Sequence, residues 1–240
     1  MIRVEHVMGM PIVVEVRDEP GSATLDRVFD WFRFVDETFS TFKETSEISR
    51  LNRGELSLED AHPDVRHVLG RCEELREATR GYFDARATGD GALDPSGLVK
   101  GWSVDRAAAL LEDAGSREYA VNAGGDMIVR GGTWRIGIQH PREQGKVAKI
   151  VEASELAIAT SGEYERGHHV LDPHTGRAPE GVLSVTVTGP ELGTADAYAT
   201  AAFAMGEDGP AWTARLPRGY EAMTILADGR VLSTGAFPAV

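Results

Sequence analysis

Apolar and polar residues follow two different periods along the chain, one in its first half and one in its second. In the first half, apolar residues recur every three or four positions, which is the period of an amphipathic helix. Ser46 is a suitable N-cap and Gly54 a suitable stop for a short helix, and Pro63 is typical of a first helical turn. The spacing predicts helices over 22–39 (capped by Ser22), 47–53, 63–80 and 103–114 (ended by Gly115).

From residue 118 onward, the pattern changes to short runs rich in β-branched residues and separated by Gly, Pro or Asp. These runs predict strands over 118–125, 126–132, 134–140, 148–153, 156–162, 168–172 and 183–189, in addition to one over 11–18. An alanine-rich helix is expected over 194–206, a short helix over 209–217, and a hairpin around Asp228-Gly229. The order predicts an α+β fold, helix-rich first and mostly β afterwards, with residues 1–240 as a single domain.

The composition narrows the classes of function. The chain has 25 Lys and Arg against 38 Asp and Glu, a net charge of −13, which argues against nucleic-acid binding because that requires clustered basic residues. An anionic ligand would therefore be held locally, by backbone amides, a lysine or a metal ion. The N-terminal stretch lacks the continuous apolar segment of a signal peptide or a membrane span, so we expect a cytoplasmic protein unless an export leader has been removed.

The alanine-rich stretch "GTADAYATAAFAMG" carries two polar residues on one helical face. Asp196 and Thr200 are four positions apart and therefore lie one turn from each other. One interpretation is structural: Asp196 favours the positive end of the helix dipole, and Thr200 bonds back to a helix carbonyl. The other is that both bind a hard cation such as Mg²⁺, which needs a further oxygen ligand from elsewhere in the chain.

Two glycine-rich segments are further candidates. "LDPSGLVKG" (93–101) offers backbone amides, backbone carbonyls and the charge of Lys100 just before a helix, which suits an anion or equally an ordinary turn capped by Ser103. "NAGGDM" (122–127) permits close backbone approach at Gly124-Gly125.

A third candidate segment is rich in histidine, and the single cysteine lies elsewhere. The segment holds His168, His169, Asp172 and His174, whose spacing is compatible with surface residues, a zinc site or a catalytic base. Cys72 is the only cysteine, so no internal disulfide forms, and its helical spacing predicts a core position.

These segments occur in an order that resembles the ApbE family, the FAD:protein FMN transferases or flavin-trafficking proteins. The matching stretches are "VMGMP", "FSTFKETSEISRLNRG", "GYFDA", "LDPSGLVKGWSVDRAAALL", "VNAGGDMIVRG", "WRIGIQHP", "IATSGEYER", "HHVLDPHTG" and "TADAYATAAFAMG". The resemblance implies an ApbE-like, T-fold-related α+β domain that binds FAD with Mg²⁺. It further implies cleavage of the FAD pyrophosphate, with transfer of FMN to a Thr or Ser hydroxyl of a flavoprotein that carries a Ser/Thr-Gly-Ala-Thr-like motif, and with release of AMP.

The resemblance also assigns roles to individual residues. The metal ligands would be the Gly97 carbonyl and the side chains of Asp196 and Thr200, with Asp196 essential for catalysis. His169 would lie near the acceptor hydroxyl and the flavin nucleotide as the catalytic base. The other FAD contacts would come from Met8, Phe42, Tyr82, Phe83, Asp84, Asp94 and Lys100.

The chain departs from the family pattern in three places, and two rival functions stay open. Phe42 replaces the usual Tyr, the 94–101 loop differs in sequence, and the segment between Asp84 and Asp94 is short. One rival is an FAD pyrophosphatase in which water is the acceptor and the products are FMN and AMP. The other is a non-catalytic FAD-binding or storage protein.

Overall fold

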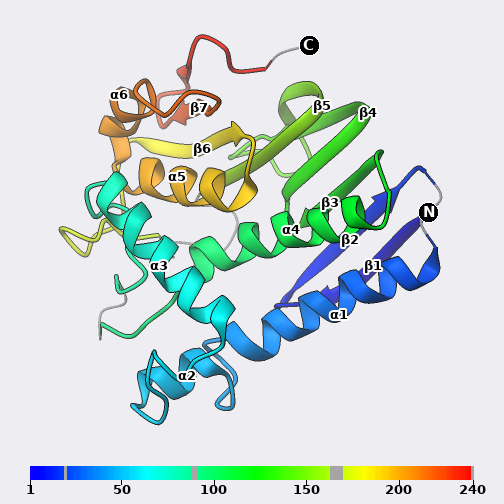
Figure 1. The fold of residues 1–240 in the computed structure, drawn as a ribbon. Coiled ribbons are helices and arrows are strands. Elements are labelled where there is room, and N and C mark those ends of the chain that lie inside the picture. The colour runs from blue at the N-terminus through cyan, green and yellow to red at the C-terminus, as the bar shows by residue number, and fades with distance from the viewer. Residues whose placement is uncertain (19–20, 88–90, 163–169, 239–240) are drawn as a thin grey trace.

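A computed structural model describes residues 1–18, 21–87, 91–162 and 170–238. In these ranges the strands form one antiparallel sheet of eight, in which each strand pairs with its neighbour in sequence (Figure 1). The strands are β1 Ile2–Val7, β2 Met10–Val16, β3 Tyr119–Ala123, β4 Asp126–Gln139, β5 Val147–Gly162, β6 Val182–Gly189, β7 Glu221–Leu226 and β8 Val231–Ser233. The helices are α1 Ser22–Phe39, α2 Glu47–Asn52, α3 Pro63–Ala78, α4 Ser96–Asp113, α5 Leu192–Ala204 and α6 Gly209–Thr213, and α6 follows a 3₁₀ turn, η1 Gly206–Asp208.

Helices α1, α4 and α5 cover one face of the sheet (Figure 1). On that face the even positions of β2, Ile12, Val14 and Val16, are fully buried against the apolar stripe of α1, which includes Phe29 and Phe32. The alternation of the strand and the period of the helix therefore generate the main core, as the sequence pattern predicts. A second apolar cluster lies on the other face, built around Trp134, Ile136 and Ile138 of β4.

Two tight turns connect neighbouring strands in the first half of the sheet. Met8 and Gly9 connect β1 to β2, and Gly124 and Gly125 connect β3 to β4. All four residues have positive φ angles, of 55°, 72°, 63° and 110°, which suits the strongly twisted two-residue hairpin turn. Glycine adopts this backbone without strain, whereas Met8 does not.

The α+β fold with a helix-rich first part is confirmed, and so are the Ser46 cap of α2 and the C-terminal hairpin. Four local predictions are wrong. Helix α4 begins at Ser96 rather than Ser103; Ser22 forms no cap hydrogen bond; each of the two pairs of short runs in 126–140 and 148–162 is one long strand; and residues 170–172, the described part of the run over 168–172, form only an isolated bridge at Asp172. In addition, strand β1 was not predicted. In the part of the chain that the structure describes, no helix has the length and apolarity needed to cross a membrane.

Candidate active site

A cavity of about 1300 Å³ opens where the β1–β2 turn, the β3–β4 turn and the first turns of α4 meet α5 and β5. A cavity of this size accommodates a ligand larger than most metabolites. The cavity is lined by predicted site residues from five separate segments of the chain. Ten of them line it: Met8, Phe42, Tyr82, Phe83, Asp84, Asp94, Gly97, Lys100, Asp196 and Thr200. The predicted base His169 lies outside the described residues, so its placement stays a prediction.

The antiparallel pair α4 and α5 supplies the polar centre of the cavity. Lys100 of α4 contacts Asp196 of α5, with 3.6 Å between Nζ and Oδ2. Further along α4, the carboxylate of Asp105 accepts hydrogen bonds from the backbone N–H groups of Leu192 and Gly193, both at 2.8 Å. Asp105 therefore caps the start of α5. Asp196, the fifth residue of this helix, lies beyond its first turn, which removes the helix-dipole explanation for this residue.

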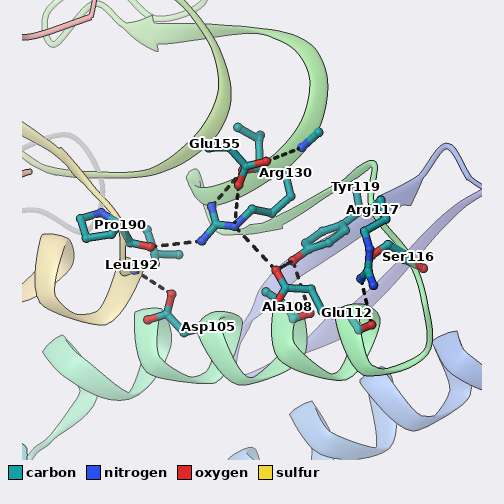
Figure 2. A network of polar contacts seen from close by, with 12 residues as sticks. Asp105, Ala108, Glu112, Ser116, Arg117, Tyr119, Arg130, Glu155, Pro190 and Leu192 are labelled. Carbon is teal, nitrogen blue, oxygen red and sulfur yellow. Dashed lines mark hydrogen bonds and ion pairs between the residues drawn. The ribbon is translucent and has the colours of Figure 1, made fainter.

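A network around Arg130 fixes the same helix pair to the sheet (Figure 2). The Arg130 side chain lies 3.3 Å from Glu155 of β5 and 3.8 Å from Glu112 of α4, and it donates a hydrogen bond to the Pro190 carbonyl just before α5. Glu112 also accepts a 2.7 Å hydrogen bond from the hydroxyl of Tyr119, and burial together with this contact raises the pKa of Tyr119. One guanidinium thus links α4, β4, β5 and the approach to α5.

Asp126 is a second carboxylate next to Lys100 that sequence reasoning missed, although it does not itself line the cavity. It is 1 % exposed, and its Oδ2 atom lies 2.5 Å from Lys100 Nζ, closer than Asp196 does. Its Oδ1 atom accepts a 2.9 Å hydrogen bond from the backbone N–H of Thr160. The available signal was its position directly after the Gly124-Gly125 turn, at the start of an apolar strand.

Thr200 faces the sheet, and its hydroxyl oxygen lies 3.3 Å from that of Ser161 on β5. Asp196 is 3 % exposed and projects from the same face of α5. Gly97 lines the same cavity, and its backbone carbonyl would add a third oxygen donor. Hard oxygen donors are the type that Mg²⁺ prefers, so the residues present fit this ion. Among the described residues, no three His, Cys, Asp or Glu side chains cluster as metal ligands.

Aromatic and acidic residues form the walls around this centre. Phe83 is buried, and its ring lies over Gly97, where an added Cβ would meet it at 3.1 Å. Tyr82 contacts the ring of His174 edge-on, with 4.6 Å between the ring centroids. Phe42, by contrast, is 95 % exposed, so it offers a free aromatic face to a ligand.

Asp84 and Asp94 line the cavity but also shape the backbone around it. Asp84 accepts a hydrogen bond from the N–H of Arg86, and Asp94 accepts one from the N–H of Ser96 at the first residue of α4. Both carboxylates therefore order the loop that leads into the helix bearing Gly97 and Lys100.

Three other candidate residues from the sequence, Asp172, His174 and Cys72, have structural roles. The Asp172 carboxylate accepts hydrogen bonds from the N–H of His174 and the hydroxyl of Thr175, which closes a turn, and His174 Nε2 lies 3.1 Å from the Arg80 carbonyl oxygen. Cys72 is buried in the main core, as predicted, and burial raises the pKa of its thiol to about 12. Burial and the raised pKa both argue against Cys72 as a nucleophile near neutral pH.

Comparison with known proteins matches the chain to the ApbE family model over residues 8–89 and 85–224. An FAD:protein FMN transferase of Vibrio cholerae is 32 % identical over 214 residues, which cover 74 % of this chain and 63 % of the relative. One from Rhodobacter capsulatus is 36 % identical over 156 residues, 59 % of this chain and 29 % of that protein. The chain therefore matches less than two thirds of the length of these relatives.

Solved structures show the same fold. The ApbE protein of Thermotoga maritima superposes on this chain with a TM-score of 0.87 at 22 % identity. The superposition covers 99 % of this chain and 97 % of the Thermotoga protein. The apo form of a flavinyl transferase ApbE from Pseudomonas stutzeri has a TM-score of 0.83 at 26 % identity and covers 98 % and 96 %. The chain belongs to the ApbE family.

Proposed function

We propose that the chain is a Mg²⁺-dependent FAD:protein FMN transferase. It would cleave FAD and attach FMN through a phosphoester bond to a Thr or Ser hydroxyl of a flavoprotein. The observation that carries the proposal is the meeting of Asp196, Thr200 and Lys100 in one cavity large enough for a dinucleotide. The names of the matched relatives support the same activity.

The chemistry requires charge neutralisation more than covalent help from the protein. The acceptor oxygen attacks the FMN phosphorus, the bond from that phosphorus to the AMP oxygen breaks, and AMP leaves. Bound Mg²⁺ would supply charge neutralisation at the pyrophosphate. Lys100 would hold a phosphate oxygen, the aromatic walls would position the flavin, and His169 would accept the proton of the hydroxyl.

The acceptor, the domain and the compartment belong to the same proposal. We expect the acceptor to carry a Ser/Thr-Gly-Ala-Thr-like motif, because the resemblance to the family implies it. A single functional domain over 1–240 and a cytoplasmic location also stay predictions.

Product analysis tests the proposal. The protein is incubated with FAD and Mg²⁺, with and without a domain bearing the acceptor motif, and AMP and FMN are quantified. The proposal predicts AMP release together with FMN bound to the acceptor. AMP with free FMN in the presence of the acceptor would indicate a pyrophosphatase, and intact bound FAD would indicate a storage protein. Asp196→Ala should abolish Mg²⁺-dependent turnover, and full activity in this variant would contradict the metal assignment.

A further inference from the structure

Two carboxylates contact one ammonium group at the wall of the cavity: Lys100 and Asp196 line the cavity, and Asp126 lies behind them. Lys100 Nζ lies 2.5 Å from Asp126 Oδ2 and 3.6 Å from Asp196 Oδ2. Both carboxylates are almost fully buried, so the interaction is screened far less than a surface ion pair. The nearer carboxylate therefore determines where the ammonium group resides.

Backbone groups, rather than flexible side chains, fix the position of Asp126. The Gly124-Gly125 turn brings it to the first residue of β4, where it pairs with Ala123. Its Oδ1 atom is held by the N–H of Thr160, one strand away on β5. This leaves Oδ2 directed at Lys100, which reaches it from the second turn of α4.

We propose that Asp126 is a positioning residue that retains the Lys100 ammonium group and thereby keeps Asp196 available to a divalent cation. Without the carboxylate of Asp126, Lys100 would close onto Asp196 and neutralise the single carboxylate of the oxygen donor set. The inference rests on the metal site of the proposed function and adds a role for a residue that does not itself line the cavity.

Metal binding in the absence of FAD tests this role. Mn²⁺ serves as the probe because free Mn²⁺ is measured directly by electron paramagnetic resonance. Asp126→Asn should raise the Kd for Mn²⁺ at least about tenfold, since it removes a charge and frees Lys100 to pair with Asp196. Asp26→Asn is the matched control: it removes the same charge from an exposed ion pair with Arg3, and it should leave the Kd within about twofold.

The double variant Lys100→Gln/Asp126→Asn separates positioning from direct ligation. It restores the wild-type net charge and removes the competing ammonium group, so its Kd should return to within about threefold of wild type. Lys100→Gln alone should bind Mn²⁺ more tightly than wild type, which tests the inference even if Asp126→Asn does not fold.

Three results would overturn the inference: wild-type affinity in Asp126→Asn, a double variant as weak as Asp126→Asn, or Lys100→Gln binding no tighter than wild type. Wild-type protein that binds no Mn²⁺ would instead remove the metal from the proposed function, and the inference with it. Tight Mn²⁺ binding with the expected variant pattern but no FAD cleavage would leave the inference standing and refute the transferase.

Discussion

Gly101 of α4 and Gly193 of α5 bring the backbones of their helices into direct contact. A Cβ atom added to Gly101 would lie 2.7 Å from the Cα and N atoms of Gly193, which is closer than real Cβ atoms approach. Gly97 and Lys100 lie just before this contact on α4, and Asp196 lies one turn after it on α5. The separation of the two helices, and with it the distance from Lys100 to Asp196, is therefore set by the absence of two side chains.

Gly101→Ala should push the helices apart. We expect it to lower the free energy of unfolding by about 1–3 kcal/mol through overpacking, and to weaken Mn²⁺ binding because Asp196 and Gly97 separate. Urea denaturation and Mn²⁺ titration measure the two effects. Gly70→Ala in α3 is the control: no atom lies within 4 Å of its added Cβ, so it should stabilise by about 0.5–1 kcal/mol and leave Mn²⁺ binding unchanged. Equal behaviour of the two variants would contradict the account.

Asp105 should give stability a dependence on pH. Burial raises its pKa to about 6, although the N–H groups of Gly193 and Leu192 favour the ionised form. The folded state therefore binds a proton more readily than the unfolded state, whose ordinary value is 3.8. The stabilising contribution is full below about pH 4 and is lost as pH rises through about 6.

Denaturation of wild type and Asp105→Asn between pH 4 and 7 measures the pH-dependent contribution of Asp105 to the free energy of unfolding. Asn cannot titrate, so the free energy of unfolding of wild type relative to Asp105→Asn should fall across this range. A difference that rises with pH would show that the capping bonds, rather than burial, set the pKa of Asp105.

Met8 combines backbone strain with a place in the cavity wall. Its φ of 55° is unfavourable for a methionine, whereas Asn tolerates this conformation. Met8→Asn should raise the free energy of unfolding by about 0.5–1 kcal/mol while weakening FAD binding several-fold. Arg80→Asn relieves the same strain, at φ 56°, outside the cavity, and should stabilise without changing the Kd for FAD. A destabilised Met8→Asn would mean that the packing of the methionine outweighs its strain.

Substitution of Phe42 should change ligand binding but not the stability of the fold. Because its ring is 95 % exposed, Phe42→Ala should leave the free energy of unfolding within about 0.5 kcal/mol of wild type. If the ring stacks on FAD, the variant loses about 1 kcal/mol of binding, or about fivefold in Kd. Quenching of FAD fluorescence in EDTA measures the Kd without turnover. Phe42→Tyr keeps the stacking face and should bind as wild type, and an unchanged Kd in Phe42→Ala would exclude stacking.

The sequence predicts most of the fold because periodicity reports burial directly. Sequence-based prediction fails where tertiary packing, rather than a turn, requires a glycine or a proline. Pro95, Gly97 and Gly101 are typical of a loop, yet they belong to the start of α4, where Pro95 precedes the first turn and the glycines admit Phe83 and Gly193. Similarly, Gly131 and Gly132 are typical of a strand break, but both have positive φ and form an irregularity within β4.

The residues of the candidate site likewise fall into two groups: those that the sequence can pair, and those that only tertiary packing brings together. Residues within one motif, such as Asp196 and Thr200, can be paired from their spacing. Asp126 and Asp105 could not be found, because each acts on a partner brought to it by the packing of helices and strands: Asp126 on Lys100, and Asp105 on the first N–H groups of α5. A single sequence carries no spacing signal for such contacts.

Intact mass spectrometry of an acceptor domain tests the central claim most directly. The domain, bearing a Ser/Thr-Gly-Ala-Thr-like motif, is incubated with the protein, FAD and Mg²⁺, and AMP is quantified in the same sample. The account predicts that the acceptor gains the mass of one FMN less one water, with one AMP released per modified acceptor and neither product formed in Asp196→Ala. An acceptor of unchanged mass, with FAD intact or converted to free FMN, would contradict it.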